Sequence, residues 1–125
     1  IGGNLTLLAN MIGTPSDYNT DQCILFIEDI GEYLYSSDRL LLQLKRSGKF
    51  KKIKALVLGG FTDIKDTDRP FGKTIDEILH SYTQELKVPV CFNFPVSHNK
   101  ENAALKIGVK YSLNVTKKKV TLAEV

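Results

Sequence analysis

Two segments of the sequence combine residues that could carry out acid–base chemistry. In ILFIEDIGE, the apolar run Ile24–Ile27 is followed by Glu28 and Asp29, and in FPVSHNKEN, His98 follows a second apolar run. A histidine base needs a group that fixes its tautomer and supports its positive charge, and either acid could supply that carboxylate. Loops at strand ends often carry such side chains. The two acids could equally be solvated charges where a strand reaches water.

The sequence offers no evident nucleophile for this base. Ser97 adjoins His98, but neighbours on an extended chain point apart, so we expect its hydroxyl to face away from the imidazole. Cys23 and Cys91 lie in apolar runs and are expected to be buried free thiols, typical of a reducing compartment. His80 is expected on the solvated face of a helix. Nucleophile-elbow, P-loop, dinucleotide-binding and zinc-protease motifs are absent from the sequence.

Helices and strands must position these residues. Apolar spacing predicts a helix after an Asn4 N-cap that closes near Gly13, a second helix from Ser36-Ser37-Asp38 to Gly48, and a third that begins at a Thr74/Glu77 capping box. Continuous or alternating apolar runs predict strands at Cys23–Ile27, Ile53–Leu58, Val88–Phe92, Ile107–Val109, Tyr111–Val115 and Val120–Leu122. The last two of these strands are expected to form a hairpin. This order predicts an α/β domain with helices packed on a sheet.

Composition and charge restrict the function classes. The chain has 125 residues, enough for one domain, with 42% hydrophobic and 25% charged residues. No apolar run approaches the ~20 residues that cross a bilayer, so no membrane partner is expected. The net charge of +3 is mild and its lysines are scattered, so nucleic acid is not expected as a partner. Because the chain begins with Ile1 rather than Met, we expect a piece of a longer protein.

Several motifs in the same order resemble the C-terminal domain of the serine LD-carboxypeptidases, the muramoyl-tetrapeptide carboxypeptidases that include the microcin C immunity peptidases. The segment IGGNLTLLANMIGTP is similar to the family's GGNL segment, LVLGGFTD to its "GIVFGRFTD", and FPVSHNKEN to its "FPFGHGPEN". The resemblance covers essentially the whole chain. It implies one domain over residues 1–125, with a layered β/β/α, swivelling-type fold, a mixed sheet and a C-terminal hairpin.

The resemblance also implies a mechanism. In the family's Ser-Glu-His triad, Glu28 matches the glutamate and His98 the histidine, while the serine belongs to an N-terminal domain that this sequence does not contain. The implied reaction is hydrolysis of an L-D peptide bond that releases D-alanine from murein tetrapeptide in the cytoplasm during cell-wall recycling. It needs no metal or cofactor. The implied partners are the substrate, the chain's own N-terminal domain and a second copy in a homodimer.

Some assignments stay open at this level. Glu32 is a candidate for substrate binding, and Asp29 is expected to cap a helix or to pair with Arg39. Residues that depart from the family pattern leave the substrate open: Ser97 and Asn99 for glycines, Lys100 for proline, and Ser36 and Gly60 for arginines. The alternatives are a non-catalytic module that binds peptidoglycan fragments or a protein, and a homologue that cleaves acyl-adenylate antibiotics.

Overall fold

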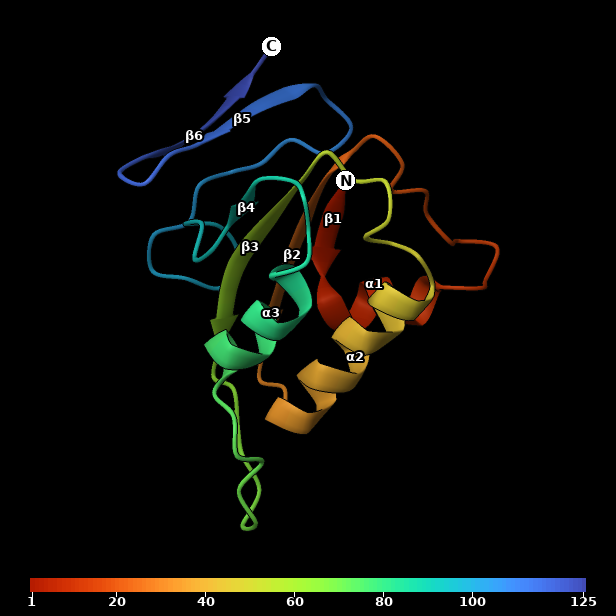
Figure 1. Ribbon diagram of the computed structural model, residues 1–125, viewed down its shortest axis with the longest axis vertical. Coiled ribbons are helices and arrows are strands. Elements are labelled where there is room, and N and C mark those ends of the chain that lie inside the picture. Colours follow the sequence, from red (N-terminus) through yellow and green to blue (C-terminus); the bar gives the residue numbers. More distant parts are fainter.

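The computed structural model describes all 125 residues and contains a four-stranded parallel sheet, three helices and a separate two-stranded antiparallel hairpin (Figure 1). The sheet has the strand order β1-β2-β3-β4, and each crossover between its strands carries one helix, as parallel connections commonly do. The elements are β1 (Gly2–Asn4), α1 (Leu5–Met11), β2 (Ile24–Ile30), α2 (Leu34–Arg46), β3 (Ala55–Thr62), α3 (Ile75–Thr83), β4 (Val90–Cys91), β5 (Tyr111–Val115) and β6 (Val120–Glu124).

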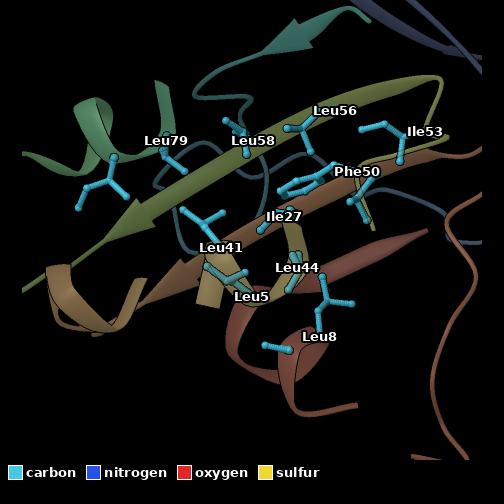
Figure 2. Close-up of a cluster of buried hydrophobic side chains, with 13 residues drawn as sticks. Leu5, Leu8, Ile27, Leu41, Leu44, Phe50, Ile53, Leu56, Leu58 and Leu79 are labelled. Carbon is cyan, nitrogen blue, oxygen red and sulfur yellow. The ribbon is translucent and has the colours of Figure 1, made fainter. Parts of the chain in front are cut away.

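The hydrophobic core lies between the sheet and the three helices. Alternate residues of a strand point to opposite faces, and on the helix-covered face β2 and β3 present large aliphatic side chains. These side chains pack against the apolar stripes of the helices (Figure 2). The core cluster consists of Leu5, Leu8, Ala9, Leu25, Ile27, Leu41, Leu44, Phe50, Ile53, Leu56, Leu58, Ile78 and Leu79. Burying one such side chain contributes about 1.5–3 kcal/mol, so this core fixes the sheet firmly.

The hairpin faces the opposite side of the sheet. Side chains of β5 and β6 and residues 105–110 line a largely apolar cavity of about 710 Å³ together with Phe26 of β2 and Val57 of β3. Leu113 and Leu122 of the hairpin contribute to its lining. The order of layers is therefore hairpin, parallel sheet, helices, which confirms the predicted β/β/α layering. The expected mixed sheet is in fact two sheets, because the antiparallel strands pair only with each other.

The predicted helix starts are confirmed at two of three positions. The side chain of Asn4 accepts a hydrogen bond from the backbone N–H of Leu7 at 3.1 Å and caps α1. At α3, the Thr74 hydroxyl accepts from the backbone N–H of Glu77 at 3.2 Å, and the Glu77 carboxylate accepts from the backbone N–H of Thr74 at 2.8 Å. The prediction for α2 is wrong, because this helix begins at Leu34 with no side-chain cap.

The strands also differ from the predictions at several points. The strand β1 was not expected, and β4 has only two residues. The segment Ile107–Val109 is a turn rather than a strand, with Gly108 at a φ of +84°. Strand β2 continues past Ile27 to Ile30, so that it contains the two acids instead of ending at them. None of the helices is long and apolar enough to span a membrane.

Candidate active site

Glu28 and Asp29 are both buried within β2, which pairs with β1 on one side and β3 on the other. Their exposed fractions are 5% and 1%. Neither acid is therefore a solvated charge at a strand end. Because successive residues of a strand point to opposite faces, the two carboxylates have different surroundings.

Asp29 points toward α1 and caps it. Its carboxylate accepts hydrogen bonds from the Asn4 side-chain amide at 2.6 Å, from the Thr6 backbone N–H at 3.2 Å and from the Thr6 hydroxyl at 2.9 Å. The expected capping role of Asp29 is confirmed, and pairing with Arg39 is wrong, since the Arg39 guanidinium lies over the Tyr35 ring at 5.1 Å. Asp29 is a structural residue that ties β2 to the start of α1.

Glu28 points to the other face, where a local irregularity of β3 makes room for it. Ile27 pairs with Leu58 and Asp29 with Phe61, so β3 has one more residue than β2 in this interval. A Cβ atom on Gly59 would lie 3.2 Å from the Cβ of Glu28 and 2.8 Å from the Phe26 ring. The glycine therefore lets the Glu28 side chain pass close to the backbone of β3.

The loop after β4 brings His98 to Glu28. The backbone N–H of Phe94 donates to the carbonyl of Leu58 at 2.9 Å, which fixes the loop to β3. Nδ1 of His98 then lies 2.9 Å from Oε2 of Glu28. The Glu28 side chain is 7% exposed and the His98 side chain 48% exposed, so the carboxylate is enclosed while the imidazole reaches solvent. Nε2 of His98 makes no hydrogen bond and is available to another group.

Ser97 is oriented differently from the prediction. Its φ of +80° turns the chain, so that Ser97 and His98 both face Glu28. The Ser97 hydroxyl donates to Oε2 of Glu28 and lies 3.0 Å from Nδ1 of His98. The assumption of an extended backbone was therefore wrong, because a left-handed residue changes the direction of its side chain. The serine itself gives no signal for this conformation, but the glycine that the family pattern has at this position is such a signal, because glycine is the usual residue where φ is positive.

The sequence profile of one protein family, described as the LD-carboxypeptidase C-terminal domain, matches residues 1–113. This chain belongs to that family. This chain is similar to a solved structure of muramoyltetrapeptide carboxypeptidase from Oxalobacter formigenes, with 41% sequence identity and a TM-score of 0.85. The match covers 97% of this chain and 42% of that one. The expected resemblance and fold are therefore confirmed.

Two curated relatives of this chain carry names that refer to different compounds. One is named "Probable murein peptide carboxypeptidase", from Bacillus subtilis, and is 33% identical over 118 residues, which are 94% of this chain and 37% of that protein. The other is named "Microcin C7 self-immunity protein MccF", from Escherichia coli, and is 32% identical over an alignment of 130 positions, which covers 99% of this chain and 36% of that protein. The LD-carboxypeptidase domain thus spans little more than a third of the length of these relatives.

The remaining candidate residues of the LD-carboxypeptidase domain lie apart from the Glu28–His98 pair. Glu32 follows β2, and its carboxylate lies 3.2 Å from the Thr6 hydroxyl, on the side of Asp29. The role of Glu32 in substrate binding stays a prediction. His80 is exposed, as expected, and stacks on Phe92 with a centroid distance of 4.7 Å.

Two of the departures from the family pattern touch each other in this LD-carboxypeptidase domain. A Cβ atom on Gly60 would lie 2.4 Å from Oδ1 of Asn99, so the Asn99 side chain occupies the space that a side chain at position 60 would need. Asn99 also follows His98 directly. The absence of a side chain at position 60 and the presence of one at position 99 are therefore coupled, and together they shape the surface beside the imidazole.

The large apolar cavity is separate from this pair. Its lining includes Ile24 and Ala55, at the beginnings of β2 and β3, whereas Glu28 lies toward the carboxyl ends of these strands. In open α/β sheets, ligands commonly bind outside the carboxyl ends of the strands. Glu28 and His98 therefore lie at the end of the sheet where ligands commonly bind, and the cavity lies toward the other end.

Proposed function

We propose that this chain is the acid–base half of a serine peptidase that hydrolyses an L-D peptide bond and releases terminal D-alanine from murein tetrapeptide. The observation that carries the proposal is the 2.9 Å distance between Nδ1 of His98 and Oε2 of Glu28. Nδ1–H donates to the carboxylate, which leaves the lone pair of the neutral imidazole on Nε2. Nε2 belongs to a half-exposed ring and can accept a proton from an incoming hydroxyl.

In this mechanism His98 acts first as a base and then as an acid. It takes the proton of a serine hydroxyl as that oxygen attacks the scissile carbonyl, and it returns the proton to the leaving amine. Glu28 orients the ring and stabilises the imidazolium. An intact, hydrogen-bonded pair favours an enzyme over a non-catalytic binding module, because a module would not need the imidazole tautomer to be fixed.

The nucleophilic serine and the oxyanion-binding amides belong, in this proposal, to an N-terminal domain of a longer protein. The greater length of the relatives supports this division. The site then lies between the two domains, the full-length protein forms a homodimer, and the reaction takes place in the cytoplasm. The residues beside His98, which include Asn99, would contact the substrate.

Release of D-alanine from murein tetrapeptide tests the proposal. We expect turnover by the full-length protein and none by the 125-residue chain, because loss of the nucleophile costs a triad enzyme on the order of a millionfold in kcat. In the full-length protein, Glu28→Ala and His98→Ala should each remove most of the activity while the protein stays folded. Rapid turnover by the isolated chain would refute the two-domain account.

A second candidate substrate is a peptidyl or acyl adenylate, as in microcin-type antibiotics. The similarity to the protein named "Microcin C7 self-immunity protein MccF" favours it, and the departures from the family pattern around His98 leave the substrate preference open. The acid–base chemistry would be unchanged, since a serine would again attack a carbonyl carbon and His98 would again protonate the group that leaves. Comparison of kcat/KM for murein tetrapeptide and for an aminoacyl sulfamoyl-linked adenosine analogue with a cleavable acyl bond would distinguish the two substrates.

A further inference from the structure

We propose that Ser97 is a positioning residue, which holds the Glu28 carboxylate in the orientation that His98 needs. Its hydroxyl donates to Oε2 of Glu28, the same oxygen that faces Nδ1 of His98 at 2.9 Å. The three polar atoms form a closed triangle, with Oγ of Ser97 3.0 Å from Nδ1 of His98. A role of Ser97 in turnover rests on the proposed function, but its effect on the imidazole does not.

The hydrogen atoms available to this triangle determine the tautomer of His98. A serine hydroxyl has one hydrogen, and here it is donated to Oε2 of Glu28, so that Oγ presents lone pairs toward His98. Nδ1 of His98 therefore faces two acceptors and must carry a hydrogen. Consequently, the lone pair of the neutral ring lies on Nε2, the nitrogen that is free to accept a proton.

Ser97 also limits the movement of Glu28. A glutamate side chain rotates about several bonds, and the only hydrogen-bond partners of this carboxylate are Ser97 and His98. His98 is exposed, whereas Ser97 is partly buried and its backbone N–H donates to Oδ1 of Asn102 at 2.8 Å. Ser97 is thus the better fixed of the two partners, and without it only a half-exposed ring would hold the carboxylate.

The backbone at Ser97 points to the same conclusion. A φ of +80° is strained for any residue with a Cβ atom, and glycine would adopt it freely. Strained backbone that the surroundings maintain is concentrated at functional sites. A glycine here would relieve the strain but could not donate to Glu28. The hydroxyl is what a serine adds at this position.

A pair of substitutions separates the hydroxyl from the backbone. Ser97→Gly and Ser97→Ala both remove the hydroxyl, but only Ser97→Gly removes the strain. Ser112→Ala, on the exposed side of β5, is the matched control. The readout is the set of imidazole ¹⁵N shifts of His98 in this chain at a pH where the ring is neutral, together with the Nδ1–H proton signal.

We expect a predominantly Nδ1–H tautomer and an observable Nδ1–H signal in the wild type and in Ser112→Ala. Both Ser97 variants should lose this signal through exchange with water and should contain more of the Nε2–H tautomer. Thermal unfolding should occur at a higher temperature for Ser97→Gly than for Ser97→Ala. Wild-type ¹⁵N shifts in both variants, or a change in Ser97→Ala alone, would overturn the proposal.

In the full-length protein, both Ser97 variants should lower kcat about tenfold with little change in KM. This loss is smaller than the loss of about 10⁴-fold that follows when an orienting carboxylate no longer holds the tautomer. If the wild-type protein does not release D-alanine, the proposed function fails, and the ¹⁵N shifts still decide the role of Ser97. Full wild-type kcat in both variants would refute the positioning role.

Discussion

Substitution of Asp29 by asparagine should destabilise the fold strongly, although the neighbouring Glu28→Gln should not. The two residues are adjacent, nearly equally buried and acidic, but their partners differ. Asp29 accepts hydrogen bonds from Asn4 and from two donors of Thr6, all of which belong to the structural junction between β2 and α1. Glu28 accepts only from Ser97 and His98.

The magnitude follows from the donors around Asp29. In Asp29→Asn, the amide oxygen can still accept from Asn4, and the Thr6 hydroxyl can rotate to accept from the new NH₂ group. The backbone N–H of Thr6 then has no acceptor, which costs about 1–3 kcal/mol, and hydrogen bonds to a neutral group replace stronger ones to a charge. We expect a loss of about 2–4 kcal/mol from a total stability of about 5–15 kcal/mol.

Urea unfolding of the 125-residue chain, followed by circular dichroism, measures this difference. Asp29→Asn should lower the free energy of unfolding by the amount above and the melting temperature by about 10 °C. Glu28→Gln removes a buried charge whose only partners are Ser97 and His98. The free energy of unfolding of this variant should therefore stay within about 1 kcal/mol of the wild-type value. Equal losses in the two variants, or a loss below about 0.5 kcal/mol for Asp29→Asn, would refute the division of roles.

Further predictions concern stability away from the site. Lys49→Met should cost about 1–2 kcal/mol in urea unfolding, because Nζ of Lys49 donates to the Tyr18 carbonyl and lies 4.3 Å from the Tyr18 ring centroid. Thr74→Ala should cost about 1 kcal/mol by the same measurement, because it removes the N-cap of α3. The pKa of Asp17 is lowered mainly by its hydrogen bond from Lys49, and that of Glu77 by hydrogen bonds from Thr74. Their stabilisation is present above the ordinary pKa values of 3.8 and 4.5 and is lost as the pH falls through the lowered values, so Asp17→Asn and Glu77→Gln should each weaken the acid dependence of the urea midpoint. An unchanged pH dependence in both variants would contradict this assignment.

Local apolar patterns predicted most of the fold but not the ends of its strands. The run Cys23–Ile27 predicts a strand, yet β2 extends over Glu28 and Asp29, because β1 and β3 pair with it on both sides and Thr6 donates hydrogen bonds to the Asp29 carboxylate. No local pattern reveals those partners. Strand β1 was missed because Gly2 and Gly3 disfavour a strand. Gly2 is required by a long-range contact, since a Cβ atom there would lie 2.0 Å from the carbonyl oxygen of Phe26.

The site was predictable only in part, for a similar reason. The residue types indicated that His98 could pair with an acid, and the family resemblance selected Glu28 over Asp29. The structure places His98 beside Glu28, while the catalytic roles stay predictions. The orientation of Ser97 depends on a positive φ, which the sequence indicates only when the residue is glycine. The contact of Asn99 with Gly60 joins two distant segments and is visible only in three dimensions.

The central claim is that His98 is the acid–base residue of a carboxypeptidase, and the two histidines of the chain test it directly. The measurement is kcat for D-alanine release from murein tetrapeptide by the full-length protein with His98→Gln or His80→Gln. We expect a loss on the order of a millionfold for His98→Gln and a rate close to that of the wild type for His80→Gln, whose ring only stacks on Phe92. Turnover by His98→Gln at the wild-type rate would contradict the claim.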